Sequence, residues 1–215
     1  MIFVNFKTYP QGTGEKAVEL AKICEQVAKT SGVEIIPVVQ VVDLWRVKQA
    51  VKIPVWIQHL DWQPQGQYTG WVNLESIIES GASGTLLNHS EHQLPPGTIN
   101  QVIKKVQSFK AMVCCRTFGQ AERLIRLKPD YLAYEPPELI GNREKSVATE
   151  KPQVIKKIVG LSNIPVIVGA GIHSRRDVEV SLKMGARGVL VATDVVLAQD
   201  PEKELKDLAK GFREK

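Results

Sequence analysis

Short apolar runs alternate with amphipathic stretches along the whole chain of 215 residues, and this alternation constrains the fold more than any other feature. The apolar runs predict strands at residues 2–6, 34–38, 55–58, 84–87, 111–115, 131–134, 165–168 and 188–191. Apolar residues at helical spacing predict helices at residues 14–30, 41–50, 74–80, 98–109, 118–127, 152–162 and 174–184, with a last helix beginning after Asp200. Alternating strands and helices indicate a parallel sheet. Eight such units without a linker favour a closed (β/α)₈ barrel, an α/β fold with a single domain over residues 1–215, rather than an open sheet.

Charge and hydropathy narrow the classes of partner. The net charge is +5, which suits an anionic ligand. The basic residues form scattered pairs on the expected helices, such as Lys104-Lys105 and Arg175-Arg176, so we expect no nucleic-acid partner. The sequence has neither a long apolar segment nor a recognisable signal peptide, so we expect no membrane partner either.

The chain has three cysteines, Cys24, Cys114 and Cys115, and no Cys-x-x-Cys pair. Adjacent residues of a strand point to opposite faces, so Cys114 and Cys115 are expected on different sides of the sheet. This usage predicts reduced, buried thiols and a cytoplasmic location.

One acidic residue follows the sixth expected strand directly. Glu135 stands between Tyr134 and Pro136-Pro137, and a proline favours extended backbone in the residue before it. The loop continues through Glu138-Leu-Ile-Gly141 into a polar segment that ends at Ser146. A carboxylate held at a strand end before a hinged loop is typical of a general base beside a lid. The alternative is a solvated surface acid before a proline turn.

Polar residues also follow the first and fourth strands. Asn5 and Lys7 are two residues apart, so their side chains are expected to face one site, where a lysine could stabilise an oxyanion. The alternative is an exposed lysine that ends a strand. His89 follows the fourth strand and could polarise a carbonyl or transfer a proton.

A metal site and a core histidine are the alternatives at the fourth strand. His89 and His92 are three residues apart and could share a metal on one helical turn. Further ligands would have to come from His59, Asp61 or His173, which together match no metal-binding motif. We therefore expect no metal.

Small residues follow the last two strands, Gly169-Ala-Gly171 after the seventh and Val191-Ala-Thr193 after the eighth. Small residues let backbone N–H groups approach a phosphate, and barrels often bind phosphate in these two loops. The glycine pair can equally form a tight turn.

Five segments together carry a resemblance to a known family. They are Asn5-Phe6-Lys7, Asn88-His-Ser-Glu91, Tyr134-Glu-Pro-Pro-Glu-Leu-Ile-Gly141, Gly169-Ala-Gly171 and Gly188-Val-Leu-Val-Ala-Thr193. In order and spacing the chain resembles triosephosphate isomerase, a TIM barrel, and the double proline resembles the archaeal branch. The resemblance implies that a small phosphorylated three-carbon substrate is isomerised between D-glyceraldehyde 3-phosphate and dihydroxyacetone phosphate through an enediolate, without a cofactor.

The resemblance also implies roles for individual residues. Glu135 would be the base, His89 the electrophile, and Lys7, supported by Glu91, the residue that stabilises the enediolate charge. The implied substrate contacts are Asn5, Phe6, Lys7, Ile140, Gly141, Gly171, Ala192 and Thr193. The loop that carries Thr69 resembles the family's intersubunit loop, which implies a homodimer or homotetramer with this loop at the interface.

The sequence departs from the family pattern at three places. Gly141 is followed by Asn142-Arg143 where the family has Thr-Gly, and the lid segment to Ser146 is about two residues longer. Asp194 follows Thr193, and His92 stands where a basic residue is usual. These departures leave two alternative functions open. One is another phosphate-binding barrel enzyme, an aldolase or a synthase, and the other is a non-catalytic barrel that binds a metabolite or a partner protein.

Overall fold

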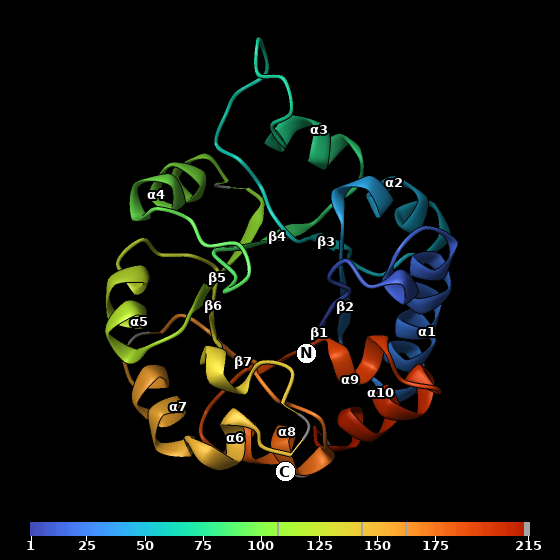
Figure 1. Ribbon diagram of the computed structural model, residues 1–215, viewed down its shortest axis with the longest axis vertical. Coiled ribbons are helices and arrows are strands. Elements are labelled where there is room, and N and C mark those ends of the chain that lie inside the picture. The colour runs from blue at the N-terminus through green and yellow to red at the C-terminus, as the bar shows by residue number, and fades with distance from the viewer. Residues whose placement is uncertain (107, 143, 162, 213–215) are drawn as a thin grey trace.

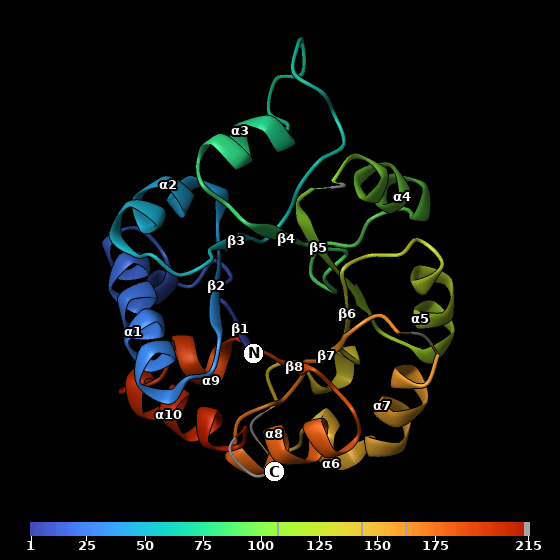
Figure 2. The same ribbon diagram turned by 180° about the vertical axis from the view of Figure 1, so that it is seen from behind.

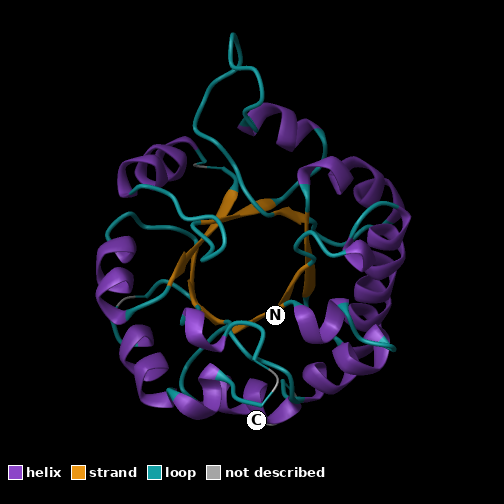
Figure 3. Cartoon of the chain, viewed as in Figure 1, coloured by secondary structure: helices purple, strands orange, loops and turns teal. Residues whose placement is uncertain are grey.

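The computed structural model describes residues 1–106, 108–142, 144–161 and 163–212, and over these residues the chain forms one closed parallel barrel surrounded by helices (Figures 1 and 3). The strands are β1 (Ile2–Asn5), β2 (Ile35–Val39), β3 (Trp56–Ile57), β4 (Gly84–Leu87), β5 (Lys110–Cys115), β6 (Tyr131–Tyr134), β7 (Val166–Val168) and β8 (Gly188–Val191). Each strand pairs in parallel with the next, and β8 pairs with β1 to close the ring. The barrel expected from the sequence is confirmed.

The helices lie outside the ring (Figures 1 and 2). They are α1 (Glu15–Ser31), α2 (Val41–Ala50), α3 (Leu74–Glu79), α4 (Pro96–Lys105), α5 (Phe118–Ile125), α6 (Val147–Glu150), α7 (Pro152–Val159), α8 (Arg175–Lys183), α9 (Thr193–Val196) and α10 (Pro201–Lys210). The expected helices at 98–109 and 152–162 end earlier, at Lys105 and Val159; Gln107 and Ser162 lie outside the described residues. The sequence did not predict the short elements α6, α9 and the 3₁₀-helices η1 (Pro10–Gly12) and η2 (Pro137–Leu139), because each is too short to show helical periodicity.

The barrel interior is a packed core and not a channel. Its side chains are Phe3, Ile36, Val38, Trp56, Leu86, Met112, Cys114, Ala133, Ile167 and Leu190. Phe3, Trp56 and Tyr131 close its amino-terminal end through edge-to-face contacts with ring centroids 4.9–5.9 Å apart. Gly84 is required beside them, because a Cβ at this position would lie 2.1 Å from the Trp56 ring.

The second core fills the space between strands and helices. Cys114 belongs to the inner core and Cys115 to the outer one, so the expectation that these thiols point to opposite faces is confirmed. None of the described helices is long and apolar enough to span a membrane.

One loop departs from the ring. The segment between β3 and α3 extends outward at the top of Figures 1 and 2. Asp61 closes its base, because its backbone N–H donates to the Val72 carbonyl and its Oδ2 accepts from the Val72 N–H, both at 2.9 Å. We call residues 62–71 the arm; it contains Thr69.

Candidate active site

The residues expected to act together meet at the carboxyl ends of the strands. One pocket there is lined by Asn5, Lys7, His89, Glu135, Ile140, Gly141, Ala170, Gly171, Ile172, Leu190, Val191, Ala192, Thr193 and Asp194. The side chains come from the ends of β1, β4 and β6, and the backbone groups from the loops after β6, β7 and β8. Closure of the barrel brings these distant segments together.

Side chains hold Lys7 in a strained backbone conformation. Its φ is 49°, in the left-handed region. Asn5 Oδ1 accepts from the Lys7 N–H at 3.0 Å, and Gln58 Nε2 donates to the Lys7 carbonyl at 2.9 Å. A non-glycine residue in this region costs on the order of 1–3 kcal/mol and persists only where its surroundings impose it. The turn points the Lys7 ammonium at Glu91, with which it forms an ion pair.

His89 is held with a defined tautomer when neutral. Asn88 before it has φ 59°, and its side chain donates to the Cys114 carbonyl at 2.9 Å and accepts from the Leu94 N–H at 3.0 Å. The backbone N–H of Glu91 donates to His89 Nδ1 at 3.2 Å. Because Nδ1 is an acceptor, the proton of the neutral ring lies on Nε2, which is 3.6 Å from Glu135 Oε2.

Glu135 is a buried carboxylate with one oxygen that makes no hydrogen bond within the described residues. Its backbone N–H continues the β5–β6 ladder by donating to the Cys115 carbonyl at 2.8 Å, which fixes the residue just past the strand. The side chain is only 6 % exposed, and Oε2 has no hydrogen-bond partner among the described residues. A buried oxygen without a donor is costly, so its presence beside a pocket indicates a functional group.

The charges of the site shift two pKa values in opposite directions. Burial works to raise the pKa of Glu135, but the charge of His89, the Cys114 thiol and Lys7 together lower it below its usual value. Burial works to lower the pKa of His89, but the charges of Glu135 and Glu91 raise it. Glu135 is therefore ionised at neutral pH, the state in which a carboxylate can accept a proton.

Glycine is needed at two places in the loop after β7. Gly169 packs against the Glu135 side chain, and a Cβ there would lie 2.6 Å from Oε1. Gly171 has φ +68°, and a Cβ there would lie 2.2 Å from the Lys145 carbonyl oxygen. The N–H groups of Gly171 and Ile172 donate to no acceptor within the described residues, so they remain available to a ligand.

The loop after β8 is connected to the loop after β1. The Tyr9 hydroxyl lies 3.2 Å from Thr193 Oγ1. This contact holds two sides of the pocket together across 184 residues of sequence.

A family model described as triosephosphate isomerase matches residues 1–210. The triosephosphate isomerase of Methanothermus fervidus is 41 % identical over 215 residues, covering 97 % of this chain and 96 % of that relative. Those of Methanosarcina acetivorans and Thermoplasma volcanium are 39 % and 38 % identical and cover 96 % and 97 % of this chain, and 96 % and 99 % of the relatives. The chain belongs to the triosephosphate isomerase family. The resemblance to its archaeal members is confirmed, and the chain is an enzyme of the isomerase class.

Two residues considered from the sequence lie elsewhere. Phe6 is fully buried in the outer core and does not line the pocket, so its position does not support the expected substrate contact. His92 stacks on His59, with ring centroids 4.3 Å apart, and His59 Nε2 bonds Asp61 Oδ1 at 2.9 Å. Over the described ranges no three His, Cys, Asp or Glu side chains are grouped so that they could hold a metal ion.

The lid segment is described except for Arg143, which lies outside the described residues. Gly141 has φ +70°, and Asn142 Oδ1 accepts from the N–H groups of Glu144 and Lys145, both at 2.9 Å. The Asn142 side chain therefore bonds back to the backbone two and three residues later, as Asn commonly does in turns.

Sequence reasoning missed three residues of the site: Gln58, Tyr9 and Cys114. Gln58 follows β3 as Lys7 follows β1, so its place at a strand end was a usable signal. Tyr9 and Cys114 gave no such signal, because a loop tyrosine and a strand cysteine are commonly packing residues.

Proposed function

We propose that this chain interconverts D-glyceraldehyde 3-phosphate and dihydroxyacetone phosphate by proton transfer. Glu135 removes a proton from the carbon next to the carbonyl, and the electron pair moves onto the carbonyl oxygen to give an enediolate. The protonated Glu135 then returns a proton to the former carbonyl carbon, while the hydroxyl proton of the first carbon passes to the enediolate oxygen. The observation that carries this proposal is the buried Oε2 of Glu135, which makes no hydrogen bond within the described residues and lies in a pocket shared with His89 and Lys7.

His89 and Lys7 stabilise the developing oxyanion in this proposal. The Nε2–H of His89 donates to the oxygen, and the Lys7 ammonium supplies fixed positive charge. A carbon atom does not fit between His89 Nε2 and Glu135 Oε2 at 3.6 Å, so the carboxylate must turn away from the ring when substrate binds. Glu135 then raises the pKa of His89 less, while burial still lowers it. Both effects favour the neutral imidazole.

The phosphate is held by backbone groups in the same pocket. We assign this role to Ile140, Gly141, Gly171, Ala192 and Thr193, supported by their place in the pocket lining. Binding energy from the phosphate, remote from the reacting carbons, can be used to organise the site for the transition state. Neither a metal nor an organic cofactor is part of the mechanism.

A coupled assay of both triose phosphates tests the proposal. Glu135→Gln should lower turnover by about 10²- to 10⁴-fold, the usual contribution of a general base. Circular dichroism should show an unchanged fold, since Gln has nearly the same volume. Undiminished turnover of this variant would refute the role of Glu135.

Asp194 lines the pocket, and a carboxylate beside a phosphate disfavours phosphate binding. This residue is the reason to test two alternative functions, another phosphate-binding barrel enzyme and a non-catalytic barrel. If inorganic phosphate raises the melting temperature but triose phosphates do not turn over, the chain is a different phosphate-binding barrel enzyme, such as an aldolase or a synthase. If triose phosphates bind without turnover and Glu135→Ala changes nothing measurable, it is a non-catalytic barrel.

We further propose that the chain forms a homodimer, or a homotetramer built from such dimers, with the arm at the interface. The arm leaves Tyr68 and Trp71 43 % and 51 % exposed, and α2 leaves Val42 and Trp45 76 % and 60 % exposed. Exposed aromatic side chains of this size mark interaction surfaces. Thr69 lies between the two arm aromatics and would enter the partner's site.

Sedimentation velocity tests the assembly. Trp45→Glu and Tyr68→Glu should each shift the protein towards monomers and lower its activity, because they put a charge into the apolar contact. Glu122→Gln on α5 serves as a surface control. An unchanged sedimentation coefficient for both variants would contradict the interface.

We also infer a cytoplasmic location. All three cysteines are free and buried, which is the state that a reducing compartment maintains.

A further inference from the structure

The carboxylate of Asp177 joins two segments that border the phosphate pocket. Asp177 lies in the first turn of α8 and is 2 % exposed. Its Oδ2 accepts from the backbone N–H groups of His173 and Ser174, at 3.2 and 3.0 Å, and from Ser174 Oγ at 2.6 Å. Its Oδ1 accepts from the Oγ of Ser146, the residue at the far end of the lid segment.

Ser146, like Asp177, is buried and makes several hydrogen bonds. The residue is fully buried, and its Oγ accepts from the Thr149 N–H at 3.2 Å and so caps α6. The next residue, Val147, donates its N–H to the Ala170 carbonyl at 3.1 Å. Segment 145–147 therefore lies directly on the loop after β7, and Gly171 faces the Lys145 carbonyl without room for a Cβ.

The two oxygens of Asp177 have different tasks. The capping box of α8 needs only two bonds, from the Ser174 N–H to Asp177 Oδ2 and from the Asp177 N–H to Ser174 Oγ. Oδ1 is directed instead to Ser146, 31 residues earlier in the chain. Helix capping alone does not explain a buried bond to another loop.

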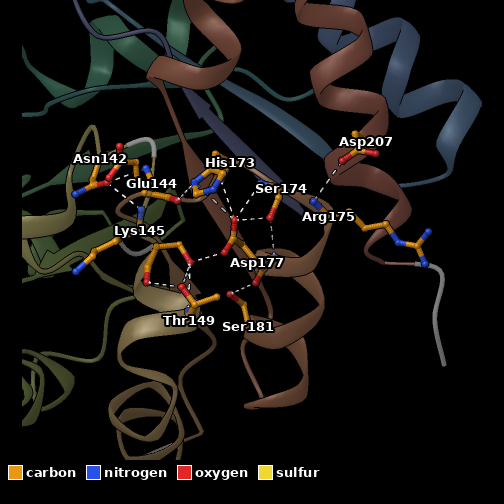
Figure 4. A network of polar contacts seen from close by, with 12 residues as sticks. Asn142, Glu144, Lys145, Thr149, His173, Ser174, Arg175, Asp177, Ser181 and Asp207 are labelled. Atoms are coloured by element: carbon orange, nitrogen blue, oxygen red, sulfur yellow. Dashed lines mark hydrogen bonds and ion pairs between the residues drawn. The ribbon is translucent and has the colours of Figure 1, made fainter.

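Asp177 also decides which N–H groups of this loop face the ligand. It accepts from the N–H groups of His173 and Ser174, which lie beside it in Figure 4. His173 Nδ1 in turn lies 2.6 Å from the Gly171 carbonyl oxygen. The N–H groups of Gly171 and Ile172 donate to no acceptor within the described residues, and both residues line the pocket.

We propose that Asp177 is a positioning residue for the phosphate subsite, acting through Ser146. Its carboxylate holds segment 145–147 against the loop 170–174, so that the Gly171 and Ile172 N–H groups are already in place when a phosphate dianion arrives. Donors that are already ordered bind an anion more tightly, because binding then costs less conformational entropy. This inference rests on the proposed function, because it takes the Gly171 loop to be the phosphate site.

Two serine variants separate this role from helix capping. Ser146→Ala and Ser174→Ala each remove one hydroxyl that donates to Asp177 and one helix cap. Only Ser146→Ala removes the side-chain hydrogen bond between the two segments. The measurement is the affinity for inorganic phosphate by calorimetry, with the melting temperature of each variant recorded beside it.

We expect Ser146→Ala to weaken phosphate binding by about 10-fold, the factor that one charge-assisted hydrogen bond commonly represents. Ser174→Ala should lower the melting temperature comparably and change phosphate affinity by less than about 2-fold, since loss of a cap acts mainly on the helix. In the isomerase assay, Ser146→Ala should raise the KM of triose phosphates more than it lowers kcat.

Asp177→Asn gives a second measurement, since it keeps the side-chain shape and should weaken phosphate binding in the same direction. The double variant Asp177→Asn with Ser146→Ala should bind phosphate no more weakly than the weaker of the two single variants, because both substitutions remove the same hydrogen bond. Equal weakening by the two serine variants, or unchanged phosphate affinity in Ser146→Ala and Asp177→Asn, would overturn the proposal. A wild-type protein that binds no phosphate would instead refute the proposed phosphate subsite, and the inference with it.

Discussion

At the scale of single residues, Lys7 shows how this chain sets the direction of a functional side chain. Two hydrogen bonds from side chains, one to its N–H and one to its carbonyl, hold it at φ 49°. Asn5 is two residues away, but Gln58 comes from the end of another strand. The strained turn is thus imposed by the barrel and points the ammonium towards Glu91 and the pocket.

The balance of charges at Glu135 gives a prediction at the same scale. Burial acts to raise the pKa of Glu135, while His89 acts to lower it. His89→Leu removes the lowering charge and keeps the site buried, so the pKa of Glu135 should rise and the carboxyl should take up a proton at higher pH than in the wild type. A ¹³C NMR titration of labelled glutamate side chains measures this shift.

His92→Leu is the matched control, because His92 stacks on His59 and does not contribute to the pKa of Glu135. Its Glu135 titration should follow that of the wild type. If the His89→Leu and wild-type titrations coincide, the charge of His89 does not govern Glu135.

At the scale of elements, the ends of neighbouring strands define the space of the site. Gly169 follows β7 and leaves room for the Glu135 side chain that follows β6. The requirement for glycine here is steric, since a Cβ would lie within 3 Å of three Glu135 side-chain atoms.

Gly169→Ala should therefore displace the Glu135 carboxylate and lower kcat by at least about 10²-fold, as misplacement of a catalytic group by 1 Å can do. The fold should survive, because a side chain can yield where a backbone atom cannot. Steady-state kinetics and thermal unfolding together check this result.

Gly119→Ala is the control within another element. Gly119 lies in α5, and a Cβ there would meet nothing within 4 Å. Alanine in a helix is favoured by up to about 1 kcal/mol over glycine, so this variant should keep full activity and melt slightly higher. Equal kinetics of the two variants would show that the contact between Gly169 and Glu135 is unimportant.

At the scale of the whole molecule, the closed barrel shields groups that would otherwise react. The three thiols are buried, two in the outer core and one inside the barrel. Burial raises the pKa of Cys24 to about 12, and it raises the pKa of Cys114 and Cys115 as well. A thiol reacts as its thiolate, so both access and charge state protect these residues.

Native protein at pH 8 should therefore leave all three cysteines unmodified by a thiol-specific chromogenic reagent, while protein in guanidinium should release three equivalents. The absorbance change over an hour measures both states. Rapid modification of the native protein would mean that the cores open locally.

Much of this arrangement could be predicted from the sequence. The alternation of apolar runs and amphipathic stretches determined the eight strands and their parallel order, since backbone hydrogen bonding and burial leave few other solutions. The end of each strand could be placed within a residue or two, and this identified Asn5, Lys7, His89 and Glu135 as candidates that face one site. The small residues after β7 and β8, together with the family's motifs, predicted that these loops bind phosphate, which stays a prediction.

Only the tertiary structure decided which candidates touch. Strand β1 ends at Asn5, one residue before its expected end, and Phe6 turns into the outer core. His59 and His92 meet each other away from the pocket. The contacts of Glu135 with His89, of Lys7 with Gln58 and of Asp177 with Ser146 join residues 31 to 51 positions apart. Such pairs depend on how the closed barrel aligns its loops, which local sequence patterns do not encode.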